Sequence, residues 1–364
     1  MRRLWVNWRK LDWFLFLAVI ILLLLSCSIL YSLNLNIENS TFVVFKKQIF
    51  FVFSGLALFF LFAKLNYSLW STYSKVIFFV FILALVLVLV FGTQVKGTTG
   101  WLRLGPLGVQ PVEFAKIALI IFLARYFSLN AQDFKLFRHI FFSGLATFVF
   151  VALVMLQPDL GSALVLLGTW VIMLLFTGIQ KKHLLWLTSS FVLVSTLAWF
   201  WLLKPYQKDR ILTFINPSLD PMGSGYNVIQ SMIAVGSGQL TGRGLALGSQ
   251  SNLHFLPEPG TDFIFSVIAE NLGFLGVTLV LALFTFIFYR LLLIMRKSQD
   301  NFAGYFILGV VAMLLVQLFI NIGMNMGISP VTGIPLPLLS AGGSSIWAIM
   351  IALGIAQNIK IRST

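Results

Sequence analysis

The stretch FLFLAVIILLLLSCSIL, residues 14–30, has no charged side chain. An α-helix of about 17 to 25 apolar residues crosses the ~30 Å hydrocarbon core of a bilayer. The basic and aromatic residues 1–10 come before this run, and it contains no small-residue cleavage site. These features indicate a retained first membrane helix, not a removed signal peptide. Cys27 lies inside the run and is the chain's one cysteine, so no intrachain disulfide can form.

Apolar runs of this kind recur along the chain, which is 59% hydrophobic and 10% charged. That composition leaves too little polar surface for a water-soluble globule. We predict an all-α, polytopic integral membrane protein of about ten helices that forms a single domain over residues 1–364. An extra or re-entrant element is a further prediction for the apolar, Gly- and Pro-rich segment 323–340. The predicted spans are 12–32, 46–64, 74–92, 113–127, 140–156, 160–178, 183–203, 261–289, 302–322 and 341–358.

The distribution of basic residues predicts the orientation. With a cytoplasmic N-terminus, 16 Lys and Arg residues fall inside, 8 fall outside, and Lys116 lies within a span. This bias predicts that both termini lie in the cytoplasm. Most acidic residues then lie outside, so we expect any active site to face outward. The net charge of +14 is scattered between apolar spans, which argues against nucleic-acid binding.

One connection, about residues 204–260, is far longer than the others and rich in turn-forming residues. Loops of this length are uncommon unless they are functional or disordered. Residues 226–235 within it have apolar side chains at helical spacing, which predicts a helix lying along the outer membrane surface.

Asp262 follows this loop at the start of the eighth predicted span. One interpretation is structural, with Thr261 as the helix N-cap and Asp262 in the first turn, where the helix dipole favours a negative charge. The other is functional, because an ionisable group at the lip of a membrane span is a candidate site. Glu270, further along the same span, must find a partner when buried, so we expect a structural pairing.

Two further acidic groups follow outer turns. Glu113 and Lys116 are one helical turn apart after Pro111, which predicts a local ion pair, although a direct role is equally open. Asp159 lies in the tight turn between the fifth and sixth spans and is predicted to cap the sixth helix. The outward bases Lys204, Lys208, Arg210, Arg103 and Arg243 either contact lipid headgroups or bind a diphosphate.

Nine short motifs occur in order along the chain: GWLRLG at 100–105, QPVEFAK at 110–116, QPDLG at 157–161, YNVIQS at 226–231, GSG at 236–238, LPE at 256–258, TDFIF at 261–265, VTGIPLP at 331–337 and SAGGSS at 340–345. Together they resemble the SEDS family (shape, elongation, division and sporulation), which implies a protein of the bacterial plasma membrane. The segment 331–337 resembles the RodA branch of that family more than the division branch, FtsW. The chain departs from the usual family residues at Val112, Asn271, Ala341 and the pair 259–260.

The resemblance implies a peptidoglycan glycosyltransferase that polymerises lipid II during cell elongation, with Asp262 as catalytic base. A divalent cation, Mg²⁺ or Mn²⁺, could bridge Asp262 and the diphosphate. The implied partners are a class B penicillin-binding protein and other elongation-complex membrane proteins. The residues expected to bind substrate are Arg103, Glu113, Lys116, Asp159, Lys208, Arg210, Arg243, Glu258 and Ser344.

Three other functions stay open at this point. One is a lipid II flippase, which would place ionisable groups near the midplane of the membrane. Another is a division-type polymerase similar to FtsW. The third is a non-catalytic scaffold for a cell-wall synthase. The outward position of the acidic residues disfavours the flippase, and Asp262 beneath its long loop disfavours the scaffold.

Overall fold

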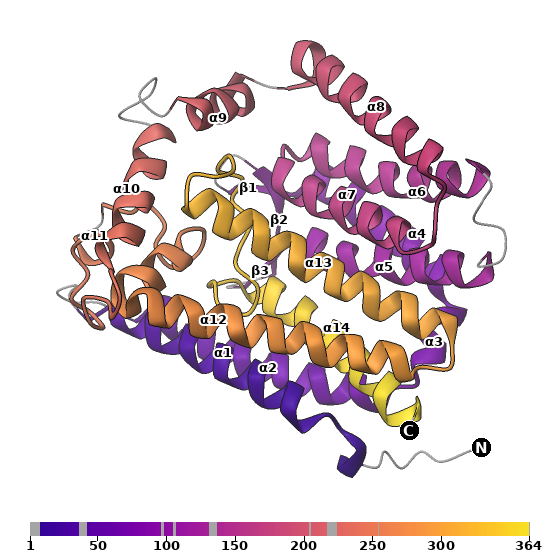
Figure 1. The fold of residues 1–364 in the computed structure, drawn as a ribbon, viewed down its shortest axis with the longest axis horizontal. Helices are drawn as coiled ribbons and strands as arrows, with labels where there is room; N and C mark the ends of the chain where they lie inside the picture. The colour runs from indigo at the N-terminus through magenta and orange to yellow at the C-terminus, as the bar shows by residue number, and fades with distance from the viewer. Residues whose placement is uncertain are drawn as a thin grey trace.

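The computed structural model describes residues 8–35, 42–95, 98–104, 107–130, 137–203, 205–216, 224–253 and 255–363. Its long helices run side by side along one axis (Figure 1). Helices α9, α10 and α11 lie at one end of this bundle, and η1 and the C-terminal end of α14 lie at the other. The elements are η1 (Trp8–Lys10), α1 (Trp13–Ser32), α2 (Val43–Lys64), α3 (Tyr67–Thr72), α4 (Ser74–Phe91), β1 (Thr93–Val95), β2 (Thr98–Leu104), β3 (Leu107–Val109), α5 (Pro111–Leu129), α6 (Phe137–Leu156), α7 (Leu160–Leu175), α8 (Lys181–Leu197), the π-helical turn η2 (Ala198–Leu202), α9 (Pro205–Ile215), α10 (Ser224–Ser237), α11 (Ser249–Asn252), α12 (Ile264–Lys297), α13 (Asn301–Asn325) and α14 (Gly343–Ser363).

Helices occupy all ten predicted spans. Among the described residues, seven helices are long and apolar enough to cross a membrane, namely α1, α2, α4, α6, α12, α13 and α14. Helix α7 is apolar but has 16 residues. The surface of the bundle is also apolar, since Phe53, Val90 and Trp201 are 69%, 69% and 80% exposed. A surface of this kind suits lipid better than water, which confirms the predicted helical membrane fold.

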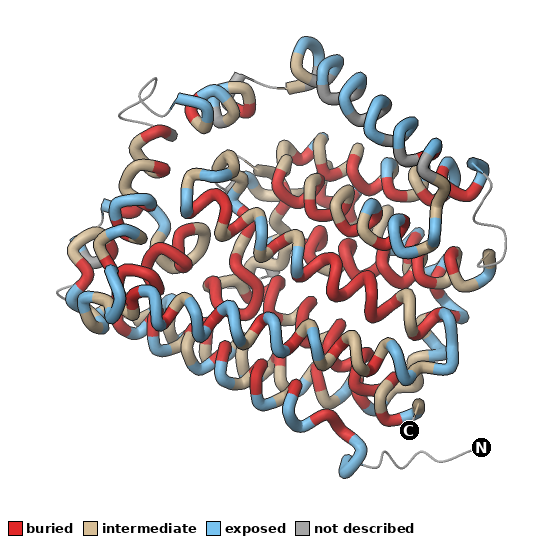
Figure 2. Tube along the Cα trace, viewed as in Figure 1, coloured by how far each residue is buried: buried red, intermediate tan, exposed pale blue. Residues whose placement is uncertain are grey.

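Helices α13 and α14 form the centre of the bundle (Figure 2). In their most apolar windows 61% and 83% of the residues are buried, against 17–44% in the other five candidate spans. Helix α14 packs mainly on α2, and α13 packs on α5, α7 and α12. These central helices therefore fix the positions of the loops at their ends.

Helix α12 differs from its prediction, because its backbone is broken at Gly273 (φ 65°, ψ −163°). The part after the break, residues 274–297, rises about 36 Å and can cross the hydrocarbon core. The part before it, residues 264–272, is too short to do so. The predicted span 261–289 thus overlaps α12, which continues to Lys297, past the predicted end.

The segment 326–342 between α13 and α14 contains no helix or strand, and yet residues 336–340 within it are buried. Side chains satisfy its backbone polar groups, as burial away from water requires. Asn321 donates to the carbonyl oxygen of Ile334 (2.7 Å), and the Leu336 N–H donates to Ser340 Oγ (2.8 Å). The extra element predicted here is thus an irregular loop whose C-terminal part is buried.

A three-stranded antiparallel sheet, in the order β1-β2-β3, precedes α5 and was absent from the sequence prediction. Arg103 of β2 pairs with Gly108 of β3. The Thr99 N–H of β2 donates to the carbonyl oxygen of Gln157 (3.4 Å), so the sheet lies against the turn between α6 and α7.

The predicted helix at 226–235 is present as part of α10, but one face of it is buried within the protein. Ser231 Oγ lies 2.7 Å from Ser266 Oγ of α12 and donates to the carbonyl oxygen of Asn325 (2.8 Å). The long connection is therefore partly folded against the bundle. Lys204 in this connection lies outside the described residues.

Candidate functional site

Asp262 lies in a turn just before α12, not inside the helix. The N-cap position is Phe263, and no side chain caps the helix, so the prediction that Thr261 is the N-cap is wrong. The main chain of the turn is held from α13 and the 326–342 loop instead. Asn321 and Asn325 each donate to the Asp262 carbonyl oxygen (3.1 Å), and Ser340 Oγ donates to the Thr261 carbonyl oxygen (2.6 Å).

The carboxylate of Asp262 lies close to the main chain of Gly333. A Cβ atom added to Gly333, whose φ is +73°, would be 3.6 Å from Asp262 Oδ2. On its other side the same stretch touches the start of α7. A Cβ atom on Gly161 would be 2.7 Å from Ile334 Cγ1 and 2.8 Å from the Thr332 carbonyl oxygen. The 332–334 stretch therefore separates Asp262 from the N-terminus of α7.

Asp159 caps α7, as predicted. Its Oδ1 accepts from the Ser162 N–H (2.9 Å), and its Oδ2 accepts from Ser162 Oγ (2.7 Å). Burial raises the pKa of the Asp159 carboxyl, whereas the Ser162 hydrogen bonds and the positive charge of Lys116 lower it.

Gln110 links Asp159 to α14. Its Nε2 atom donates to Asp159 Oδ2 (3.4 Å), and its N–H donates to Ser344 Oγ (2.9 Å). Gln110 immediately precedes Pro111 at the first position of α5, Asp159 caps α7 and Ser344 is in the first turn of α14. The N-terminal ends of three helices therefore meet at this point.

The predicted ion pair between Glu113 and Lys116 is confirmed. Lys116 Nζ lies 2.8 Å from Glu113 Oε1, and both side chains are almost completely buried. A buried ion pair is weak evidence for stability, because desolvation offsets much of the attraction between the charges. The pair lies one turn below Gln110, at the N-terminal end of α5.

Three more of the predicted site residues are Glu258, Arg103 and Lys208. Glu258 is exposed and shapes the turn before Asp262, since its carbonyl oxygen accepts from the Thr261 and Phe263 N–H groups (3.2 and 3.3 Å). Arg103 is exposed on β2. Lys208 Nζ lies 5.9 Å from the centre of the Trp199 ring, a cation–π geometry that suits an interfacial base as well as a substrate ligand.

Two basic residues of the long connection complete the predicted set. Arg243 is exposed, and its Nη1 atom donates to Ser249 Oγ (3.0 Å). Arg210 belongs to α9, although its side chain lies outside the described part of the chain. The structure thus brings Asp159, Ser344 and the Glu113–Lys116 pair to neighbouring helix ends, with Asp262 on the other side of the 332–334 stretch. Among the described residues, no contact brings Arg103 or Lys208 to them.

Sequence reasoning assigned no role to three polar residues of the site, Gln110, Asn321 and Asn325. Asn321 and Asn325 are one helical turn apart at the end of the apolar helix α13, and both are fully buried. A buried polar pair at that spacing in a membrane helix is a signal that could have found them.

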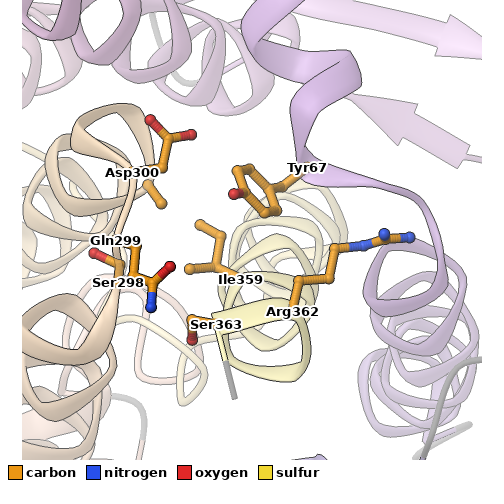
Figure 3. Close-up of a pocket in the computed structure, with 8 residues that line it drawn as sticks. Tyr67, Ser298, Gln299, Asp300, Ile359, Arg362 and Ser363 are labelled. Atoms are coloured by element: carbon orange, nitrogen blue, oxygen red, sulfur yellow. The ribbon is translucent and has the colours of Figure 1, made fainter.

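A separate pocket of about 260 Å³ lies near the start of α13 (Figure 3). Its polar lining includes Tyr67 of α3, Asp300 before α13 and Arg362 near the end of α14. The 25 residues of α13 separate it from Asn325 by roughly 36 Å. The pocket is therefore not part of the site around Asp262.

The fold and this site define a polytopic helical membrane protein with a polar, partly acidic site at the ends of its helices. The family model described as "Cell cycle protein" for FtsW, RodA and SpoVE matches residues 9–364. The chain belongs to the FtsW/RodA/SpoVE family, which confirms the resemblance drawn from its motifs.

Named relatives match the chain over nearly its whole length. Stage V sporulation protein E of Bacillus subtilis is 36% identical and covers 95% of this chain and 96% of its own. Peptidoglycan glycosyltransferase RodA of Treponema pallidum is 33% identical, covering 96% and 98%. Peptidoglycan glycosyltransferase MrdB of Escherichia coli is 34% identical, covering 97% and 94%.

Solved structures show the same fold. A chain from a structure described as "Structural coordination of polymerization and crosslinking by a peptidoglycan synthase complex" superposes with a TM-score of 0.81 at 33% identity and covers 99% of both chains. The rod shape determining protein RodA of Thermus thermophilus gives a TM-score of 0.71 at 29% identity, covering 97% of this chain and 98% of its own.

Proposed function

We propose that this chain is a peptidoglycan glycosyltransferase that polymerises lipid II into glycan strands, with Asp262 as the catalytic base. The single observation that carries the proposal is the support of Asp262. Its main chain is held by two buried asparagines, and its carboxylate lies beside the 332–334 stretch. A carboxylate whose main chain is fixed in this way is pre-positioned for chemistry.

In the proposed reaction, Asp262 accepts the proton of the acceptor sugar's 4-hydroxyl as that oxygen attacks the anomeric carbon of the donor. The new C–O bond forms as the bond from the anomeric carbon to the diphosphate breaks. The lipid diphosphate leaves with the electron pair, and the anomeric centre is inverted. Removal of a general base typically slows such a step by about 10²- to 10⁴-fold.

The surroundings of Asp262 suit an anionic leaving group. Helices α5, α7 and α14 meet with their N-terminal ends, whose partial positive charges favour phosphate. Lys116 adds a buried positive charge that Glu113 balances. Arg243 supplies a guanidinium that fits a diphosphate, because its planar fork of donors matches phosphate oxygens.

A divalent cation, Mg²⁺ or Mn²⁺, fits the chemistry of Asp262 but would depend on the substrate. Among the described residues, no group of three or more His, Cys, Asp or Glu side chains could hold a metal. Mg²⁺ commonly binds one or two carboxylates together with substrate phosphates. Asp262 would be the protein ligand, and the ion would neutralise charge on the leaving diphosphate.

We further propose that the protein acts in cell elongation and works with a class B penicillin-binding protein. The 331–337 motif supports the elongation role, because it resembles the RodA branch. The proposed partner is supported by the solved peptidoglycan synthase complex to which this chain is similar, with a TM-score of 0.81, because that structure is described as coordinating polymerisation and crosslinking. We place the site on the outer face of the plasma membrane, with both termini cytoplasmic, on the charge bias of the loops.

The arrangement supports a flippase less well. A transporter places its ionisable groups near the midplane, where both sides of the membrane reach them in turn. Here Asp159 and Asp262 both precede helices, and Glu113 is in the first turn of α5. These three acidic groups therefore gather at one end of the bundle.

The test is polymerisation of purified lipid II by the wild type and by Asp262→Asn, each with and without the class B partner. Asp262→Asn keeps the main-chain anchors, so its thermal stability and partner binding should equal those of the wild type while polymer is lost. If Asp262→Glu keeps activity that rises with added Mn²⁺, the cation role is supported. Polymerisation by Asp262→Asn near the wild-type rate would exclude Asp262 as the base.

A further inference from the structure

The break in α12 leaves main-chain groups on both sides of Gly273 without helical partners, and the long connection supplies the missing partners. The Arg243 and Gly244 N–H groups donate to the carbonyl oxygens of Glu270 and Asn271 (2.9 and 3.0 Å). In the other direction, the Phe274 and Leu275 N–H groups donate to the carbonyl oxygens of residues 239 and 240 (2.8 and 3.1 Å). The connection is thus bonded to both halves of α12.

Glycines make this close approach possible. A Cβ atom on Gly273 would be 2.3 Å from the Gly242 nitrogen, and one on Gly242 would be 2.2 Å from the Asn271 carbonyl oxygen. One on Gly238 would overlap the Ala269 carbonyl oxygen. No side chain fits at these positions unless the backbone moves, so the segment around Arg243 has a defined place against α12.

The side chain of Glu270 adds a second anchor. It is 0% exposed, and its two oxygens accept hydrogen bonds from the main-chain N–H groups of Gln250 (2.8 Å) and Ser251 (3.0 Å) in α11. Gly248 leaves room for it, because a Cβ atom there would be 2.6 Å from Glu270 Oε2. The expected structural pairing of Glu270 is therefore with two backbone amides, not with a cation.

The contacts of Glu270 and α11 lead to Arg243, a residue proposed to bind substrate. Ser249, next to the two anchored amides, accepts the hydrogen bond from Arg243 Nη1 (3.0 Å), and Arg243 Nε donates to the Ser237 carbonyl oxygen (3.4 Å). Glu270 thus holds Arg243 twice, once through its own carbonyl oxygen and once through α11 and Ser249. About 10 Å of short helix separates Glu270 from Asp262.

We propose that Glu270 is a positioning residue, whose buried carboxylate fixes α11 and thereby aims the Arg243 guanidinium at the diphosphate of the substrate. The inference rests on the proposed function, because it gives Arg243 the diphosphate as its ligand. Glu270 itself touches no reacting atom. Loss of its carboxylate should weaken substrate binding far more than it slows the chemical step.

The experiment measures kcat and KM for lipid II in Glu270→Gln, Arg243→Ala and the double variant. A charge-assisted hydrogen bond contributes about 1.5–3 kcal/mol, so Arg243→Ala should raise KM roughly 10- to 100-fold. Glu270→Gln should raise KM by no more than that, with kcat within about twofold of wild type. The double variant should match Arg243→Ala, because the effect of Glu270 passes through Arg243.

Two further variants test the links without removing Glu270. Gly248→Ala pushes the carboxylate away from the amides, and its φ of −68° suits alanine. Ser249→Ala removes the acceptor of Arg243 Nη1. Each should raise KM, and each effect should vanish in the Arg243→Ala background. If Glu270→Gln does not fold, the KM values of Gly248→Ala and Ser249→Ala in the two backgrounds decide whether the path from Glu270 to Arg243 matters for binding.

The outcomes separate this inference from the proposed function. If the wild type makes no polymer while it is stable and partner-bound, the proposed function fails. If it polymerises lipid II but the KM effects of Glu270→Gln and Arg243→Ala multiply, Glu270 acts independently of Arg243 and the positioning role is wrong. Inhibition by undecaprenyl diphosphate is a second readout, and its inhibition constant should rise in parallel with KM.

Discussion

Asn325 Nδ2 donates a 3.1 Å hydrogen bond to the main-chain carbonyl oxygen of Asp262, and Asn325 Oδ1 accepts from Ser266 Oγ at 2.6 Å. One buried amide thus ties the turn that carries the candidate base to the helix that follows it. Because this bond reaches the main chain, the Asn325 anchor does not involve the carboxylate of Asp262. The support of the site and its chemistry can be separated by mutation.

Asn325→Ala should lower both stability and polymerisation. Each buried group left without a partner costs about 1–3 kcal/mol, and the Asp262 turn loses one of its anchors. Lipid II turnover and the melting temperature in detergent measure the two effects. Asn358→Ala is a matched control at the other end of the bundle, since Asn358 is also buried and also bonds main-chain groups, the Tyr67 N–H (2.9 Å) and the Ala63 carbonyl oxygen (2.7 Å).

The control should lose stability and keep its turnover per folded molecule. If both variants lose turnover equally once it is normalised to folded protein, Asn325 has no special connection with the site.

The Glu113–Lys116 pair gives a second prediction. Lys116→Met alone leaves a buried carboxylate without its partner and should cost about 3–5 kcal/mol. The double variant Glu113→Gln with Lys116→Met removes both charges at similar volume and should recover most of that stability. Turnover should stay low in the double variant, because the positive charge near Asp159 is gone. Recovered turnover together with recovered stability would make the pair purely structural.

Local sequence patterns predicted what local geometry determines. The spacing of Glu113 and Lys116 on one helix face gave their ion pair, and the tight turn before Leu160 gave the Asp159 cap. The lengths of the apolar runs located the helices, because the length of a membrane span can be read from consecutive residues alone. These features follow from neighbours in the chain.

Features that depend on distant contacts were missed or misplaced. The break at Gly273 is stabilised by main-chain partners about 30 residues earlier in the chain, so the sequence pattern continues through it as one apolar run. Thr261 reads as an N-cap, yet its carbonyl oxygen is held by Ser340, 79 residues away. Local capping rules cannot anticipate such a partner.

The orientation is tested by cysteine labelling in a Cys27→Ala background. Leu247 is 72% exposed in the long connection, and Gln299 is exposed at the opposite end of the bundle. The charge bias predicts that Leu247→Cys reacts with a membrane-impermeant maleimide in intact cells, whereas Gln299→Cys reacts only after the membrane is opened. The reverse labelling pattern would show that the predicted orientation is wrong and that the proposed site faces the cytoplasm.

Gly161→Ala tests whether the 332–334 stretch positions Asp262. The new methyl group would lie 2.8 Å from the Thr332 carbonyl oxygen, which is backbone and cannot rotate away, so the stretch must shift. A displacement of about 1 Å near reacting groups can cost roughly 10²-fold in rate, and we expect a 10- to 100-fold loss of turnover. Gly236→Ala on α10 is the control, because a Cβ atom there meets nothing within 4 Å and should leave turnover unchanged. Wild-type turnover in a folded Gly161→Ala variant would show that Asp262 acts without the 332–334 stretch.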